Sequence, residues 1–336
     1  MKVHPFSMGQ ARQWHHEEPG LVSLSVWTER VQDRGEDADP LVLIHRPTGR
    51  GLIAVFDGAG GVGRATAGGS AGPVEPTQAW VASRRLRGLV EEWFVSGEPH
   101  DNLQPRIAAR LAENLRTRSR MRGTIAREFP STLAALDFRC TSNTQVSWDV
   151  LWAGDSRCYL ATPDDGLQQL SKDDVAGTDA LELLLQDPPM TNMVSADRDF
   201  ALNRWQGRTR LPCLLLVATD GFFGYVATPA LFEHLLWETL GAARDCHSWA
   251  GLLIRRVRAY TGDDASLALV GLGFRDFTHL REAFRDRATH LSVVHDAPLR
   301  GAEGERLIAA RAESWRRYQP GYEQRWPHVA LGEGRW

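Results

Sequence analysis

Four short segments of this chain place an aspartate next to glycine or another small residue, at the end of or beside an apolar, strand-like run. They are V-F-D-G-A-G-G (55–61), W-A-G-D-S-R (152–157), V-A-T-D-G (217–221) and T-G-D-D-A-S (261–266). Glycine lets the backbone approach a ligand closely, and carboxylate oxygens are the ligands that Mg²⁺ and Mn²⁺ prefer. Solvated turns explain four such segments poorly, so the pattern favours a fold that gathers strand ends around hard cations.

Composition narrows the class of protein. The 336 residues can form one large domain or two smaller ones, and 43% hydrophobic with 24% charged residues is typical of globular proteins. The net charge of −3 gives no basic excess, so nucleic acid is not an expected partner. The four cysteines show no C-x-x-C spacing, which favours free thiols in a reducing compartment. Without a signal-like N-terminus or a long apolar run, we expect a cytoplasmic protein with no membrane partner.

Hydrophobic periodicity predicts an order of strands and helices without regular βαβ alternation. Strands are expected over 21–31, 41–45, 52–56, 131–138, 145–153, 157–161, 214–218 and 267–273. Helices are expected over 77–95, 102–120, 181–186, 229–240, 248–260, 276–288 and 303–318. This order favours a layered α+β domain with mainly antiparallel sheets. We expect an N-terminal segment over 1–20, a main domain over 21–274 and a C-terminal helical extension over 275–336.

Several acidic residues follow or precede these predicted strands. Glu36 and Asp37 follow the first strand, Asp57 and Gly58 follow the third, Asp220 ends the central strand, and Asp263 precedes the last. If the strand ends converge, the carboxylates raise one another's pKa values unless cations neutralise them. Two such ions can bridge a water, lower its pKa and hold a phosphoryl group in line with it. The pattern therefore predicts hydrolysis of phosphate esters without a protein nucleophile.

The segments, in this order, resemble the motifs of the metal-dependent serine/threonine protein phosphatases of type 2C. That family carries an E-D pair, D-G-x-G-G, G-S-T, G-D-S-R, an L-T-K-D-H-like segment, S-D-G and D-N-x-T. This chain has Glu36-Asp37, D-G-A-G-G from Asp57, S-T at 131–132, G-D-S-R around Asp155, L-S-K-D-D at 170–174, T-D-G around Asp220, and D-D-A-S from Asp263. The resemblance covers roughly residues 21–273, which makes 21–274 the expected catalytic domain.

The resemblance implies a four-layer α-β-β-α sandwich of two antiparallel sheets, with two Mn²⁺ or Mg²⁺ ions at one edge and a weaker third. It implies that Asp57 bridges both metals, that the carbonyl of Gly58 binds one, and that Asp220 and Asp263 complete the other. Glu36 and Asp37 would coordinate directly or through water, and Asp155 would belong to the third site. A metal-bridging water or hydroxide would then hydrolyse phosphoserine and phosphothreonine in proteins. The implied partners are a phosphorylated protein and a cognate serine/threonine kinase.

Four positions depart from the family pattern. Gly224 stands where an aspartate often helps hold the third metal, and Asp264 replaces the asparagine of D-N. Pro130 replaces the glycine before S-T, and Gln32 takes the place of a phosphate-gripping arginine. Arg34 or Arg30 could grip the phosphate instead, because a guanidinium binds phosphate through two hydrogen bonds. The general acid is left open.

These departures keep two alternatives open, a catalytically idle regulatory or binding module and a phosphatase for a small phosphorylated metabolite. We also expect Arg84, Arg85 and Arg87 to form a solvated helix face, and the aromatic C-terminal extension to pack on the main domain rather than dock a partner.

Overall fold

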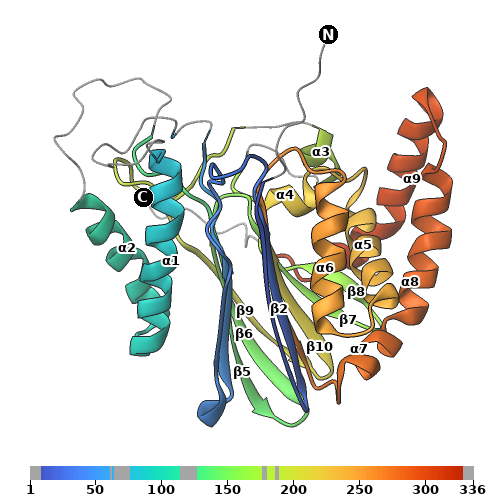
Figure 1. Ribbon diagram of the computed structural model, residues 1–336, viewed down its shortest axis with the longest axis horizontal. Coiled ribbons are helices and arrows are strands. Elements are labelled where there is room, and N and C mark those ends of the chain that lie inside the picture. The colour runs from blue at the N-terminus through green and yellow to red at the C-terminus, as the bar shows by residue number, and fades with distance from the viewer. Residues whose placement is uncertain are drawn as a thin grey trace, which may run out of the picture.

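Two antiparallel sheets lie face to face, with helices on both outer sides (Figure 1). The computed structural model describes residues 9–60, 63, 76–113, 127–175, 180–185 and 189–327. Within these residues the order of layers is helices, sheet, sheet, helices, which confirms the predicted α-β-β-α sandwich. The arrangement follows from the strands, because a sheet that is apolar on both faces must be covered on both.

The larger sheet has six strands among the described residues, and every neighbouring pair is antiparallel. Its order is β1 (Ala11–Glu18), β2 (Leu21–Thr28), β11 (Ala265–Leu272), β10 (Cys213–Ala218), β7 (Arg157–Thr162) and β8 (Gly166–Gln169). The central strands β10 and β11 are buried along their whole length. Their sequences accordingly read as continuous apolar runs rather than as alternating patterns.

The smaller sheet has five strands in the described part of the chain, also antiparallel throughout. Its order is β3 (Leu41–His45), β4 (Arg50–Val55), β5 (Leu133–Ser142), β6 (Gln145–Ala153) and β9 (Asn203–Arg210). A register shift between Cys140 and Ser142 marks a bulge near the turn that joins β5 to β6.

Helices form the two outer layers (Figure 1). On the smaller sheet lie α1 (Gln78–Ser96), the 3₁₀ turn η2 (His100–Asn102) and α2 (Leu103–Ala112). The larger sheet is covered by α4 (Asp220–Phe223), α5 (Pro229–Ala242), α6 (Cys246–Arg258), α7 (Phe277–Ala283), α8 (Arg285–Leu291) and α9 (Gly304–Tyr322). Short elements complete the set: η1 (Arg46–Thr48), α3 (Ala180–Leu185), the π-helical turn η3 (Ser292–Asp296) and η4 (Ala297–Leu299).

The core divides into three apolar layers because side chains alternate across each strand. Along β10, Leu215 and Val217 face the other sheet, whereas Leu214 and Leu216 face the helices. The helix-side layer of the larger sheet also buries Trp315, Tyr318 and Tyr322 of α9. The C-terminal helix therefore packs on the main domain, as the sequence predicts.

Some elements differ from the sequence-based expectation. β1 lies inside the predicted N-terminal segment and pairs along its length with β2, and β8 and β9 were not predicted. The helix expected over 276–288 is two helices, because Phe284 has non-helical backbone angles. α2 ends at Ala112, and residues 114–120 of the helix expected there lie outside the described residues. The domain boundaries remain a prediction.

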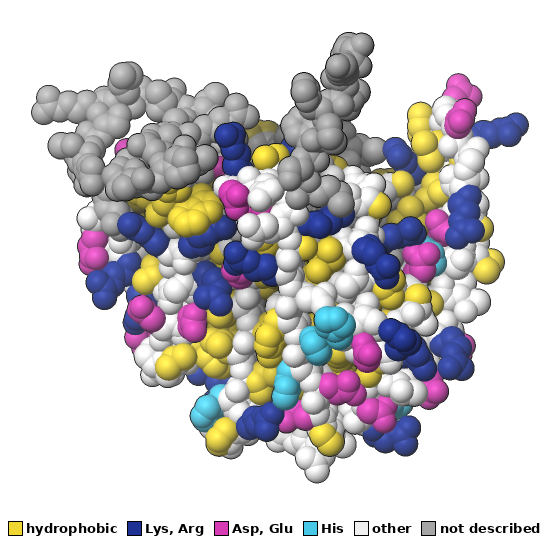
Figure 2. Space-filling view, in the orientation of Figure 1, with side chains coloured by type: hydrophobic (Ala, Val, Ile, Leu, Met, Phe, Trp, Pro, Cys, Tyr) yellow, Lys and Arg dark blue, Asp and Glu magenta, His cyan; other side chains and the backbone are white. Residues whose placement is uncertain are grey.

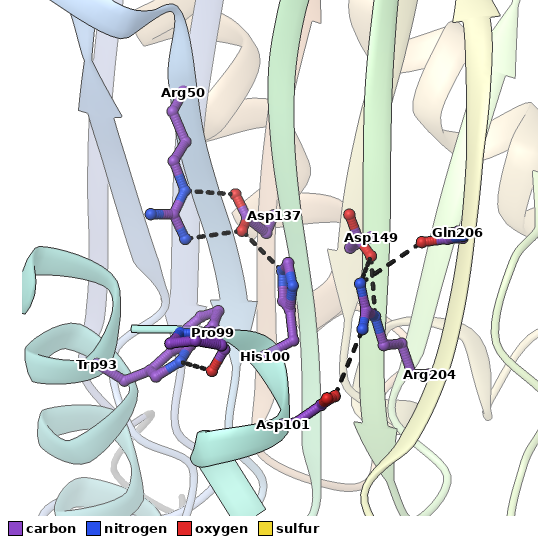
Figure 3. Close-up of polar contacts among 9 residues, drawn as sticks. All are labelled: Arg50, Trp93, Pro99, His100, Asp101, Asp137, Asp149, Arg204 and Gln206. Carbon is purple, nitrogen blue, oxygen red and sulfur yellow. Dashed lines mark hydrogen bonds and ion pairs between the residues drawn. The ribbon is translucent and has the colours of Figure 1, made fainter. Parts of the chain in front are cut away.

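A buried polar cluster ties η2 to the outer face of the smaller sheet (Figure 3). Asp137 on β5 accepts hydrogen bonds from Arg50 Nε and Nη2 at 3.1 and 2.8 Å, and it contacts His100 Nε2 at 2.9 Å. Burial alone would raise the pKa of Asp137, but the bonds from His100 and Arg50 outweigh it and lower the pKa. Arg204 makes a second, more exposed pairing with Asp149 and Asp101 beside it.

Basic and acidic side chains are interspersed over the face shown in Figure 2, without a large area of a single sign. Cys158, Cys213 and Cys246 are buried free thiols, and Cys140 is partly exposed. None of the described helices combines the length and the hydrophobicity that a bilayer-spanning segment needs.

Candidate functional site

Strand pairing brings the acidic segments to the same end of the sandwich. Thr28, at the end of β2, pairs with Ala265, so the loop after β2 adjoins the D-D-A-S segment. Ala218, at the end of β10, pairs with Arg157 of the G-D-S-R segment. Gly58, three residues after β4 ends at Val55, forms an isolated bridge with Ser131. Segments far apart in the sequence thus become neighbours through sheet register.

The S-T pair fixes the backbone of Asp57. The carbonyl oxygen of Asp57 accepts hydrogen bonds from the Thr132 amide and the Ser131 hydroxyl, both at 2.8 Å. The Thr132 hydroxyl lies 2.7 Å from the hydroxyl of Ser156 in G-D-S-R. This chain of contacts explains why serine and threonine occur there, since small hydroxyls can satisfy buried backbone groups.

Asp37 is held by the two segments that carry Asp220 and Asp263. Its Oδ2 accepts hydrogen bonds from Thr219 Oγ1 at 3.0 Å and from Ser266 Oγ at 2.7 Å, and the residue is 2% exposed. Thr219 immediately precedes Asp220 in the chain. The buried carboxylate of Asp37 therefore locks the E-D, T-D-G and D-D-A-S segments to one another.

Glu36 is anchored by the first turns of α1. Its Oε1 accepts a hydrogen bond from Thr77 Oγ1 at 2.5 Å, and its carbonyl accepts one from Ser83 Oγ, also at 2.5 Å. Arg84 donates to the carbonyls of Glu36 and Gly35 at 3.3 and 3.1 Å. The expectation that Arg84 belongs to a solvated face is wrong, because this partly buried guanidinium stabilises the loop that carries the E-D pair.

Asp264 has a structural contact that the sequence left open. Its Oδ1 accepts a hydrogen bond from the amide of Arg30 at 2.7 Å, and its Oδ2 accepts one from the amide of Glu36 at 2.6 Å. Both oxygens of a carboxylate can accept, whereas the asparagine of the family motif offers a single acceptor oxygen. A Cβ on Gly221 would clash with the Asp264 carbonyl, so the glycine of T-D-G permits this close packing.

The carboxylates influence one another strongly. Burial raises the pKa of Asp57 well above its ordinary value, and the nearby charges of Asp37, Asp220, Asp155 and Asp263 raise it further. Burial and the charge of Asp220 likewise raise the pKa of Asp155. The five predicted aspartates therefore share one region of electrostatic repulsion, as the sequence predicts for strand ends that converge.

The carboxylate oxygens of this site suit a hard cation, although they do not form a complete coordination sphere. The oxygen-only chemistry fits Mg²⁺ or Mn²⁺, and Asp155 Oδ1 is a buried acceptor without a hydrogen-bond partner among the described residues. Within the same residues, however, no three His, Cys, Asp or Glu side chains are arranged to hold one ion. The carboxylates of Asp220 and Asp263 thus lie near enough to act on Asp57 without forming a three-carboxylate cluster among the described residues.

The two arginines considered for the phosphate differ in position. Both Arg30 and Arg34 are exposed. The charge of Arg30 acts on Asp263, where it partly opposes the rise in pKa that burial causes. Arg34 belongs to a turn in which its amide donates to the carbonyl of Val31 at 3.1 Å. Of the two, Arg30 is the one that the structure brings near a candidate site carboxylate.

The sequence missed how the L-S-K-D-D segment supports G-D-S-R. Arg157 makes a buried two-pronged ion pair with Asp173, with Nη2 to Oδ2 at 2.6 Å. Asp174 Oδ2 accepts a hydrogen bond from the Gly154 amide at 3.0 Å, and its own amide donates to the Gly154 carbonyl. The arginine of G-D-S-R and the first aspartate of L-S-K-D-D therefore form an ion pair. The presence of both motifs in one sequence is the signal that could have predicted this contact.

Comparison with known proteins agrees with this geometry. The family model described as "Protein phosphatase 2C" matches residues 30–253. A crystal structure of a bacterial serine phosphatase has 15% identity and a TM-score of 0.51, and the match covers 79% of this chain and 98% of that one. The serine/threonine phosphatase Stp1 from Staphylococcus aureus has 15% identity and a TM-score of 0.50, with coverage of 81% and 99%. At this identity the two structures show the fold alone. A search of curated proteins gave no match.

Proposed function

The chain belongs to the protein phosphatase 2C family, and from this premise we propose that it hydrolyses phosphoserine and phosphothreonine in proteins with Mn²⁺ or Mg²⁺. The family and the fold support phosphatase activity. The observation that carries the proposal is the crowding of Asp37, Asp155, Asp220 and Asp263 around Asp57, at the end of the sandwich where the motifs meet.

In this proposal each residue has a separate task. Asp57, Asp220, Asp263 and the carbonyl of Gly58 would hold two ions, Glu36 and Asp37 would contribute directly or through water, and Asp155 would belong to a weaker third position. When bound, the metals would lower the pKa of a water molecule and neutralise charge on the phosphoryl oxygens. Thr219 and Ser266 keep Asp37 in place, and Thr132 keeps Asp57 in place. Arg30 binds the phosphate from the loop after β2, where it lies close enough to act on Asp263.

Substitution of single carboxylates tests this assignment. We expect Asp57→Asn and Asp220→Asn to abolish Mn²⁺-dependent hydrolysis of p-nitrophenyl phosphate while leaving the fold intact, as judged by circular dichroism. Asp149→Asn is the matched control, because it removes the same charge from a surface pair with Arg204 on the outer side of the smaller sheet. Substantial residual activity in both site variants would count decisively against the assignment.

The substrate class needs its own comparison. We expect kcat/KM for a phosphoserine peptide to exceed that for small phosphorylated metabolites, with a serine/threonine kinase as the enzyme that supplies such substrates in signalling. A strong preference for a small metabolite would favour the second reading of the same chemistry. An intact, folded protein with no turnover of any ester in Mn²⁺ or Mg²⁺ would instead identify an idle regulatory module.

A further inference from the structure

We propose that Tyr322 of α9 is a positioning residue for the reaction. It acts through Arg157 on the turn that carries Asp155 and on the helix that begins at Asp220. This inference rests on the proposed function. It concerns the helix α9, which lies outside residues 30–253, the part of the chain that the family model matches.

Arg157 lies at the junction of two acidic motifs. It is 2% exposed, and its ion pair with Asp173 uses Nε and Nη2. Its guanidinium carbon lies 4.1 Å from the centre of the Phe223 ring, and Phe223 ends the short helix α4 that Asp220 begins. One side chain therefore contacts both the L-S-K-D-D segment and the T-D-G helix, and it stands two residues after Asp155 in the chain.

Tyr322 supplies a further polar contact of this guanidinium, on a nitrogen that Asp173 does not bind. Arg157 Nη1 donates a hydrogen bond to the Tyr322 hydroxyl at 3.3 Å. The Tyr322 ring is 1% exposed and is fixed by Tyr159, Tyr318 and Trp315, whose ring centres lie 6.2, 5.4 and 5.8 Å away. A buried cation needs every donor satisfied, so the hydroxyl restricts where Arg157 can lie.

The residues that follow α9 contact both sheets beside the Arg157–Asp173 pair. The side-chain amide of Gln168 on β8 donates a hydrogen bond to Gln324 Oε1 at 2.8 Å and accepts one from Arg325 Nε at 2.7 Å. The carbonyl of Arg325 accepts a hydrogen bond from Trp205 on β9 at 3.0 Å, so the segment joins the edge strands of both sheets. Lys172, next to Asp173, lies over the ring of Trp326. The C-terminal extension thus covers the Arg157–Asp173 pair and fixes Tyr322 above it.

A comparison of two tyrosines on the same helix tests the proposal. Tyr322→Phe removes the hydroxyl that faces Arg157. Tyr318→Phe removes a buried hydroxyl one turn earlier, which donates to Glu233 Oε2 at 2.8 Å and does not contact Arg157. Both variants should lower the thermal unfolding midpoint. Only Tyr322→Phe should accelerate amide hydrogen exchange in peptides covering 152–160 and 219–225, and only it should weaken Mn²⁺ binding by calorimetry, roughly 3- to 10-fold.

Arg157→Lys provides the second arm, because lysine cannot make the two-pronged contact with Asp173. In that background Tyr322→Phe should change neither exchange nor Mn²⁺ affinity further, since both act through the same guanidinium. The proposal is overturned if the two tyrosine variants behave alike in exchange and Mn²⁺ binding. Neither hydrogen exchange nor Mn²⁺ binding requires turnover of a substrate. A wild-type protein without phosphatase activity would therefore refute the proposed function, and the comparison of the two tyrosine variants would still decide the role of Tyr322.

Discussion

At the scale of single residues, Asp57 shows most clearly that the candidate site lowers the stability of the metal-free fold. Its carboxylate is surrounded by four others, and burial together with their charges raises its pKa. A carboxyl group with a raised pKa in the folded state contributes stability below its unfolded pKa, near 3.8. That stability is lost as the pH rises through the folded-state pKa. At neutral pH this contribution to stability is therefore reduced, because burial among like charges disfavours the ionised form of the carboxyl group.

We predict that Asp57→Asn makes the metal-free protein more stable at pH 7, because burial and the charges of neighbouring aspartates disfavour ionisation of Asp57. Asparagine resembles the neutral acid in shape and cannot ionise. Urea unfolding in the presence of a chelator measures the difference, which should shrink as the pH approaches 4. A variant less stable than the wild type at pH 7 would contradict this explanation.

Individual site residues were predictable from the sequence only where they belong to a recognisable motif. Asp57, Asp220 and Asp263 stand out because each lies beside glycine, just after or just before an apolar run. Arg84 and Asp264 gave no comparable signal, since both act by binding backbone groups that only the folded chain brings near them. Their roles depend on tertiary contacts, which periodicity along one helix or loop does not encode.

At the scale of elements, the cluster around Asp137 joins η2 to the smaller sheet (Figure 3). We predict that Asp137→Asn lowers the free energy of unfolding by roughly 3 kcal/mol, because it leaves the half-buried Arg50 without its charged partner. Chemical denaturation at pH 7 measures the loss. Asp149→Asn, in the more exposed pair with Arg204, should cost about 1 kcal/mol or less. Equal losses in the two variants would show that burial of the Asp137 pair does not matter.

His295 in the turn η3 gives the helical layer a pH dependence. Burial, together with the charges of His290 and Arg287, lowers the pKa of His295 to about 4 from 6.5. Stability from a depressed pKa is fully present above 6.5 and is lost as the pH falls toward 4. We predict that the wild type loses up to about 3 kcal/mol over this window. His295→Gln, which can still bond Ser314, should lose less; the same slope of unfolding free energy with pH in both proteins would contradict this prediction.

Elements were predictable where their burial pattern is strong. The buried strands β10 and β11 appear in the sequence as apolar runs, and the structure places them centrally. The edge strand β1 has the sequence A-R-Q-W-H-H-E-E, in which exposed polar residues leave no alternation to detect. The edge strand β9 alternates in burial, but Trp205 is its one large apolar side chain, so its hydrophobic signal is weak. Such strands are defined by hydrogen bonds to a neighbour and by charged residues that protect an edge, not by a hydrophobic face.

At the scale of the whole molecule, the C-terminal extension is part of the core rather than an addition to it. Phe277, Phe284, Trp315, Tyr318 and Tyr322 are almost fully buried on the larger sheet. We predict that truncation after Gly273 abolishes cooperative thermal unfolding. Truncation removes these side chains, each worth roughly 1.5–3 kcal/mol when buried, and exposes the apolar surface that they cover, a loss comparable to the whole stability of a typical domain. A truncated protein that unfolds cooperatively would refute this view.

The convergence of distant acidic segments is the central claim, and direct titration with Mn²⁺ tests it best. Calorimetry on the intact chain should detect Mn²⁺ binding at neutral pH. Binding should be lost or weakened by orders of magnitude in Asp57→Asn, and it should be unchanged in Asp149→Asn. A wild-type protein that binds no Mn²⁺ or Mg²⁺, or an Asp57→Asn variant that binds them as tightly as the wild type, would contradict the account.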